Sequence, residues 1–182
     1  VGHGISLIAA GREATQGFFD IALRANGKSG FHEVCAPPAD GRMENVAATG
    51  NGEHGVDLTC NKQFSMARGV ASGNALDGIR CVFTRHPYGH VTVLKLADTA
   101  ADDNGHAGVS VTDAEVATAY RLELLDSRVT GNGGHGLAVS AAGTGTQMRW
   151  PICSSSGLTS GLAASSSSTE RPYCAAMTAM VS

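Results

Sequence analysis

The stretch Asn51-Gly52-Glu53-His54-Gly55-Val56-Asp57-Leu58 begins with Asn, continues through three residues to Gly, and then enters an alternating run. The same form begins again at Asn26, Asn74, Asn104 and Asn132, and a copy without its Asn opens the chain as Gly2-His3-Gly4-Ile5. The repeat glycines are separated by 26, 25, 23, 30 and 28 residues. A short motif at such an interval predicts a repeat protein whose units stack on one another.

Five of the six repeat glycines are followed by apolar residues at two alternate positions, for example Val56 with Leu58 and Val109 with Val111. This alternation is typical of strands. A second alternating run, such as Val91-Thr92-Val93, lies between successive motifs. No segment sustains a helical period, and the leucine spacing of leucine-rich repeats is absent. We therefore predict an all-β fold, a right-handed parallel β-helix of about six coils.

The Asn and Gly of the motif have distinct expected roles. Asn tolerates left-handed backbone geometry, and its side-chain amide can bond to the neighbouring coil. Asn residues stacked on successive coils would form an amide ladder inside the turn. We expect Gly to supply a positive φ where the chain bends into the next strand.

Composition fits a packed domain, since 42% of the 182 residues are hydrophobic and the net charge is only −3. So small a charge gives no basic surface for nucleic acid, and no apolar run is long enough for a membrane span. The period stops near Thr144, and the Ser-rich runs 154–156 and 165–168 follow. We predict a β-helix domain over 1–144 and a Ser-rich tail over 145–182, which is either a cap or disordered. Because the motif is already under way at Gly2, we expect the chain to be part of a longer one.

The coils beginning at Asn51 and Asn74 resemble those of bacterial right-handed β-helix proteins, mannuronan C5-epimerases and polysaccharide lyases above all. The epimerase signature Tyr-Gly-Phe-Asp-Pro-His-Glu has its counterpart in Ser29-Gly30-Phe31-His32-Glu33, which keeps Gly, Phe, His and Glu but not the Tyr or the Asp-Pro pair. The resemblance implies an acidic polysaccharide as partner, a secreted or cell-surface location, and Ca²⁺ as the ion that such enzymes commonly use.

Aligning the repeats on their glycines gives columns of outward-pointing residues. Two residues after the glycine the column contains Ser6, His32, Asp57, Arg80, Ser110 and Ala138; one residue before it, His3, Ser29, His54, Asp77, Ala107 and His135. Ionisable members concentrate in the second to fourth coils, so the candidate site is His32, His54, Asp57, Asp77 and Arg80. Arg can pair with a uronate carboxylate, and His held by Asp can transfer protons near neutral pH. Polar outward residues also simply suit a solvated face.

Other features carry weaker expectations. Glu33 interrupts the inward apolar pattern, which indicates either a bulge that turns His32 and Glu33 outward or a loose coil interrupted by Pro37-Pro38. His86 and His90 flank Pro87 and Gly89, so we expect a loop without a metal. Asp98, Asp102 and Asp103 suggest a solvated acidic turn rather than a calcium loop. Cys35 and Cys60 should stack as a disulfide or as buried thiols; the sequence does not decide between these.

We therefore expect a carbohydrate-active protein that acts on or binds an acidic polysaccharide, with no cofactor or metal required by the residues themselves. Whether it is an enzyme stays open; if catalytic, it should be a lyase or a C5-epimerase. The alternative is a non-catalytic β-helix segment of an adhesin, a phage tail spike or a surface protein. The oligomeric state is not indicated.

Overall fold

A computed structural model describes residues 2–10, 16–36, 40–60, 63–84, 92–113, 120–140, 146–150 and 177–181. These residues form strands and turns and contain no helix, so the prediction of an all-β fold is confirmed. Accordingly, the described residues include no helix that could cross a membrane.

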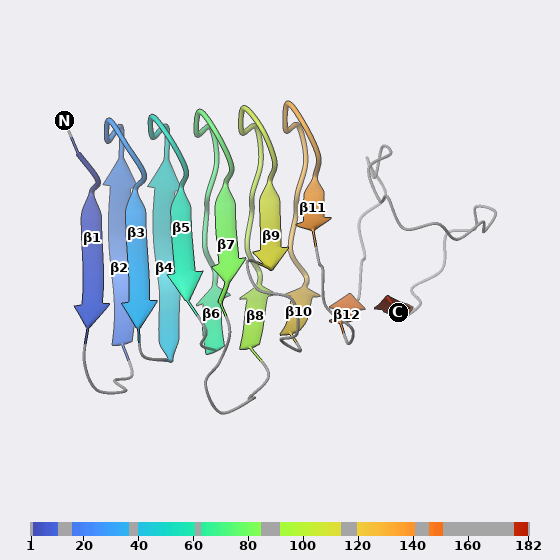
Figure 1. Ribbon diagram of the computed structural model, residues 1–182. Coiled ribbons are helices and arrows are strands. Elements are labelled where there is room, and N and C mark those ends of the chain that lie inside the picture. The colour runs from blue at the N-terminus through green and yellow to red at the C-terminus, as the bar shows by residue number, and fades with distance from the viewer. Residues whose placement is uncertain are drawn as a thin grey trace.

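Two sheets make up the solenoid (Figure 1). Sheet A contains β1 (Ile5–Ala10), β3 (Phe31–Ala36), β5 (Val56–Cys60), β7 (Ile79–Phe83), β9 (Val109–Asp113) and β11 (Leu137–Ser140). Sheet B contains β2 (Gln16–Arg24), β4 (Gly41–Thr49), β6 (Gln63–Ala67), β8 (Thr92–Ala97), β10 (Tyr120–Leu125), β12 (Thr146–Trp150) and β13 (Met177–Val181).

The chain alternates between the two sheets, and every strand from β1 to β12 pairs in parallel with strands of the neighbouring coils. Isolated parallel β-bridges join Ala47 to Val70, Val70 to Ala100, and Ala100 to Arg128. They form a short third side of the solenoid between sheet B and sheet A. The parallel β-helix is thereby confirmed, with one strand of sheet A for each repeat. Past Thr144, β12 extends sheet B and β13 pairs with it antiparallel; residues 151–176 of the expected tail lie outside the described part.

The core lies between the sheets and is built from the inward residues that the alternation predicts. Phe31, Val56, Ile79 and Val109 pair in one register and are fully buried. Glu33 continues this pattern, because it pairs with Leu7 and Leu58 in unbroken register and is 0% exposed. The expected bulge at Glu33 is therefore wrong, because the side chain lies on the inward face of a regular strand. The other reading, a loose coil interrupted by Pro37-Pro38, falls on residues outside the described part.

The predicted amide ladder is present in the turns that lead into sheet A. Side-chain Nδ2 of each Asn donates to Oδ1 of the next, at distances of 2.8 to 2.9 Å, along Asn26, Asn51, Asn74, Asn104 and Asn132. The same Oδ1 also accepts the backbone N–H of the preceding Asn, as Asn74 does from Asn51 at 3.0 Å. These bonds satisfy polar groups that the turn buries between coils.

The expected backbone roles of the motif residues are wrong. Positive φ occurs at the residue before each Asn (Ala25, Gly50, Gly73, Asp103 and Gly131) and at a second corner (Asp20, Asn45, Arg68, Asp98 and Asp126). The repeat glycines instead allow close approach. A Cβ on Gly55 would lie 2.6 Å from the carbonyl oxygen of Gly78 and 2.7 Å from Nδ2 of Asn74. Gly is thus needed because neighbouring coils touch there.

Candidate functional site

The column two residues after the glycine lies on the outer face of sheet A, as the sequence predicts. Ser6 pairs with His32, His32 with Asp57, Asp57 with Arg80, Arg80 with Ser110, and Ser110 with Ala138. Adjacent members therefore stand one strand spacing apart, about 4.8 Å. The column one residue before the glycine is aligned by backbone bonds such as Gly30 N–H to His54 O and Gly55 N–H to Asp77 O.

Asp57 joins three of the five predicted residues into one group. Its carboxylate lies 3.0 Å from Nδ1 of His32 and accepts a hydrogen bond of 2.8 Å from Arg80. Asp57 is 6% exposed, whereas the Arg80 side chain is 39% exposed. A guanidinium has five N–H donors, so Arg80 keeps donors for a further partner while Asp57 holds it in place.

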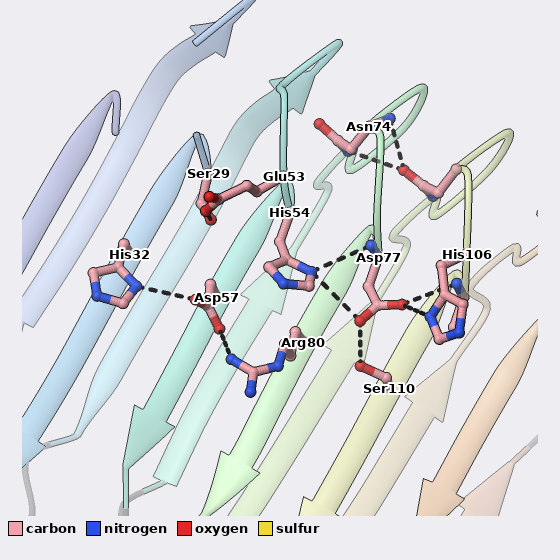
Figure 2. A network of polar contacts seen from close by, with 12 residues as sticks. Ser29, His32, Glu53, His54, Asp57, Asn74, Asp77, Arg80, His106 and Ser110 are labelled. Carbon is pink, nitrogen blue, oxygen red and sulfur yellow. Dashed lines mark hydrogen bonds and ion pairs between the residues drawn. The ribbon is translucent and has the colours of Figure 1, made fainter. Parts of the chain in front are cut away.

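Asp77 is the centre of a second group, which contains the other two predicted residues and two that were not predicted (Figure 2). Its Oδ1 lies 2.6 Å from Nδ1 of His106 and accepts the Ala107 N–H at 2.9 Å. Its Oδ2 accepts the Ser110 hydroxyl at 2.9 Å and lies 3.4 Å from Nδ1 of His54. One carboxylate, 5% exposed, thus joins residues of three successive coils.

The electrostatics of Asp77 favour its charged form. Burial raises the pKa of this carboxyl, but hydrogen bonds from His54, His106, the Ala107 N–H and Ser110 outweigh burial and hold the pKa well below its usual range. Asp77 is therefore a buried anion at neutral pH. A buried charge of this kind requires the donors that surround it.

His3 lies just before β1, at the edge of sheet A, and its ring stacks on the His32 ring with centroids 4.4 Å apart. Burial, followed by the charges of His32 and Lys28, lowers the pKa of His3. The positively charged form of His3 is thus disfavoured.

In the same column as His3, the Ser29 hydroxyl donates to the Glu53 carboxylate at 3.5 Å, which is the limit of a hydrogen bond.

The structure brings the predicted residues together as two groups, around Asp57 and around Asp77. His106 was not predicted, because it lies in the column two residues before the glycine and so outside the two columns that contain the predicted residues. The sequence signal was available, since Lys28, Glu53 and His106 share that column. Ser110 lies in the column two residues after the glycine, but its hydroxyl is not ionisable and the predicted site contained only ionisable residues.

The acidic turn differs from its prediction. Asp98 and Asp103 are exposed, but Asp102 is buried. Asp102 accepts from Nε of Arg128 at 2.7 Å and from the Thr130 N–H and hydroxyl, so it links coils rather than facing solvent. Within the described ranges no three His, Cys, Asp or Glu residues are placed to hold a metal.

Several sequence features lie outside the described residues. The segment 85–91, which contains His86 and His90, is one of them. The side chains of Cys35 and Cys60 are likewise not described, so their pairing stays a prediction; Cys81 is buried in sheet A. Comparisons of the chain with models of protein families, with curated proteins and with solved structures found no match.

Proposed function

We propose that the outer face of sheet A binds an acidic polysaccharide and presents its uronate residues to the histidines beside Asp57 and Asp77. One observation carries the proposal: Asp57 fixes Arg80 and His32 on neighbouring coils, at 2.8 and 3.0 Å, and Arg80 stays partly exposed. A guanidinium held in this way can pair with a uronate carboxylate. The proposal implies a secreted or cell-surface protein.

Geometry and charge both support a polymer as ligand. The outward residues recur at about 4.8 Å along the solenoid, a step on the scale of one sugar residue. Imidazoles near neutrality can carry a proton or accept one, and three of them contact the two buried carboxylates. The resemblance of the coils to those of uronate epimerases and lyases points to the same class of ligand.

The binding test uses calorimetric titration with oligouronates from alginate and from pectate, and a neutral cello-oligosaccharide as the control ligand. Arg80→Gln should weaken oligouronate binding by about 10-fold or more, because a charge-assisted hydrogen bond is lost. Lys95→Gln is the matched control, since Lys95 is an exposed cation on sheet B. Equal losses in both variants, or no binding of any oligouronate by the folded wild-type protein, would overturn the proposal.

A second candidate is a non-catalytic β-helix segment of an adhesin, tail spike or surface protein. The observation in its favour is that Asp57 and Asp77 already accept bonds from residues of neighbouring coils. Such bonds would also hold coils together in a protein without a ligand. On this candidate, Arg80→Gln lowers the stability of the protein and leaves its binding partners unchanged.

A further inference from the structure

Four of the five rungs of the amide ladder belong to the same dipeptide, Asn-Gly, and only Asn74 is followed by Ala. Asn-Gly is chemically labile, because the backbone nitrogen of the Gly can attack the side-chain carbonyl carbon of the Asn. Gly favours this attack, since it has no Cβ to obstruct the approach and its backbone rotates freely. The ladder therefore carries a reactive dipeptide in most of its rungs.

The contacts between coils explain why Gly follows these Asn residues. A Cβ on Gly52 would collide with the carbonyl oxygen of Gly27, and a Cβ on Gly105 would collide with that of Ala75. A Cβ on Gly133 would lie 2.5 Å from the carbonyl oxygen of Gly105. The packing of neighbouring coils thus requires the same residue that makes the dipeptide labile.

At the inner rungs the ladder holds both reacting groups. Nδ2 of Asn51 donates to Asn74 and to the Leu23 carbonyl. Oδ1 of Asn51 accepts from the backbone N–H and from the side chain of Asn26. The attacking nitrogen, that of Gly52, donates its own hydrogen to the Asn26 carbonyl at 2.8 Å. Attack would have to break several of these bonds at a residue that is 2% exposed.

The other two inner Asn-Gly dipeptides share this arrangement to different degrees. Asn104 has the same set of side-chain bonds as Asn51, is also 2% exposed, and is followed by Gly105, whose N–H donates to the Asn74 carbonyl. Asn132 is only half-buried, but the N–H of Gly133 is bonded as well. Protection should therefore be greatest at Asn51 and Asn104 and smaller at Asn132.

Asn26 is held much less firmly. Within the described residues its Oδ1 accepts no hydrogen bond, and its Nδ2 donates only to Asn51, at 2.9 Å. The N–H of Gly27, which is exposed, has no partner among those residues either. Asn26 itself is half-buried. Its side chain can therefore turn toward the Gly27 nitrogen at the cost of a single bond.

We propose that Asn26 is the site at which this protein modifies itself by deamidation, and that the ladder protects the Asn-Gly dipeptides of the inner coils. The reaction needs no ligand, so it is independent of the proposed polysaccharide binding.

The chemistry is a cyclisation followed by a hydrolysis. The Gly27 nitrogen gives its proton to hydroxide and forms a bond to Cγ of Asn26. The Cγ–Nδ2 bond breaks, and Nδ2 leaves as ammonia with a proton from water. A water molecule then opens the cyclic imide, at the new N–Cγ bond to give Asp or at the original peptide bond to give isoaspartate. The net reaction consumes water, releases ammonia and requires no oxidant.

The product alters the first rung of the ladder. A carboxylate accepts hydrogen bonds but cannot donate them, so the side-chain bond from position 26 to Oδ1 of Asn51 is lost. Isoaspartate also adds a methylene to the backbone of the turn that leads into β3. Deamidation thus loosens the contact between the first two Asn-bearing coils and leaves the bonds from Asn51 to Asn74 in place.

Peptide mapping by mass spectrometry tests the order of the sites. Folded protein, and protein unfolded in urea, are kept at mildly alkaline pH and digested, and the Asp and isoaspartate at each Asn-Gly are followed with time. The rates in urea give the intrinsic reactivity of each sequence. Folding should slow Asn51 and Asn104 by about 10-fold or more relative to Asn26, because several bonds must break first. Equal slowing at Asn26 and Asn51 would overturn the proposal.

Gly27→Ala tests the chemistry at Asn26 without altering an inner rung. Ala75 already occupies the equivalent position after Asn74. The added Cβ hinders the attack on Cγ, so Asn26 should deamidate more slowly while the thermal midpoint stays close to that of the wild-type protein. An unchanged rate at Asn26 would show that the Gly27 nitrogen is not the attacking group, which contradicts the proposed reaction.

Asn26→Ala tests the protection by the ladder. It removes the side-chain donor from Oδ1 of Asn51 but keeps the backbone of the first rung. Asn51 should then deamidate about 3-fold faster, because one bond fewer holds its side chain. Asn104, two rungs further along, is the matched control and should keep its rate, since a general loosening of the fold would accelerate both sites. No change at Asn51, or an equal rise at both residues, would refute the protective role.

Discussion

The side-chain amide of Asn51 donates to Oδ1 of Asn74 at 2.8 Å, and both residues are 2% exposed. Asn74 also accepts the Asn51 backbone N–H and donates to Asn104 and to the Ala48 carbonyl. Asn74→Ala would leave several of these groups buried without partners, so we expect a loss of about 3 kcal/mol in the free energy of unfolding. Denaturant titration gives the value.

Asn26→Ala is the control for this prediction, because Asn26 stands at the first rung, is only half-buried, and its amide donates to Asn51. We expect it to cost about 1 kcal/mol. Equal costs at the two positions would contradict a stabilising role for the interior of the ladder.

The two kinds of glycine should respond differently to Ala. Gly55→Ala places a Cβ 2.6 Å from the Gly78 carbonyl oxygen, so coils must separate and the cost should be about 3 kcal/mol or more. Gly50→Ala has open space but a φ of +63°, so it should cost about 1 kcal/mol. Ala25 and Asp103 already adopt positive φ at equivalent positions. Thermal melts of both variants rank them; a larger loss for Gly50→Ala would refute the close-approach argument.

The depressed pKa of Asp77 predicts a pH-dependent contribution to stability. A carboxyl with a folded-state pKa below its unfolded value, about 3.9, stabilises the fold above that pH. The contribution is lost as the pH falls through the folded-state pKa. The penalty of Asp77→Asn should therefore be largest near pH 7 and shrink as the pH falls below about 4. Urea titrations of both proteins across this range test it, and a constant penalty would count against it.

Burial in the inward columns predicts the cost of core truncation. Ile79 is fully buried between β5 and β9, so Ile79→Ala should cost about 3 kcal/mol. Ile8 is 78% exposed on β1, so Ile8→Ala should change the free energy of unfolding by less than about 0.5 kcal/mol. Denaturant titration of this pair compares the same substitution on the two faces of one sheet.

Most of the solenoid could be predicted because the same short motif recurs in successive coils, so that each copy supports the interpretation of the others. The spacing of the Asn-x3-Gly motif gave the number of strands in sheet A, and glycine alignment gave the register of His32, Asp57 and Arg80. The position of Glu33 was misjudged because apolar alternation describes the average of many coils. A single polar residue can occupy an inward position if the surrounding coil accommodates it, and the pattern does not reveal this.

The errors at Gly55 and Asp102 have one physical origin. The role of each residue depends on how close it lies to atoms of the neighbouring coil. A sequence compared one coil at a time contains no such distances. The prediction of the site was limited in the same way. Asp77 was identified from its column, but it contacts His106, which lies in a different column and on the next coil. Predicting that contact would require the three-dimensional bend of the chain at Gly108.

Each interior rung of the Asn ladder, Asn51, Asn74 and Asn104, accepts from the coil before it and donates to the coil after it. For the ladder alone, a duplicated unit inserted between two of these rungs would therefore find an Asn donor in the coil before it and an Asn acceptor in the coil after it. The cluster around Asp77 has no such freedom: one extra coil between His54 and Asp77 would separate them by a full rise. The polar cluster around Asp77, rather than the backbone of the solenoid, thus restricts where a coil can be inserted in the middle of this rod.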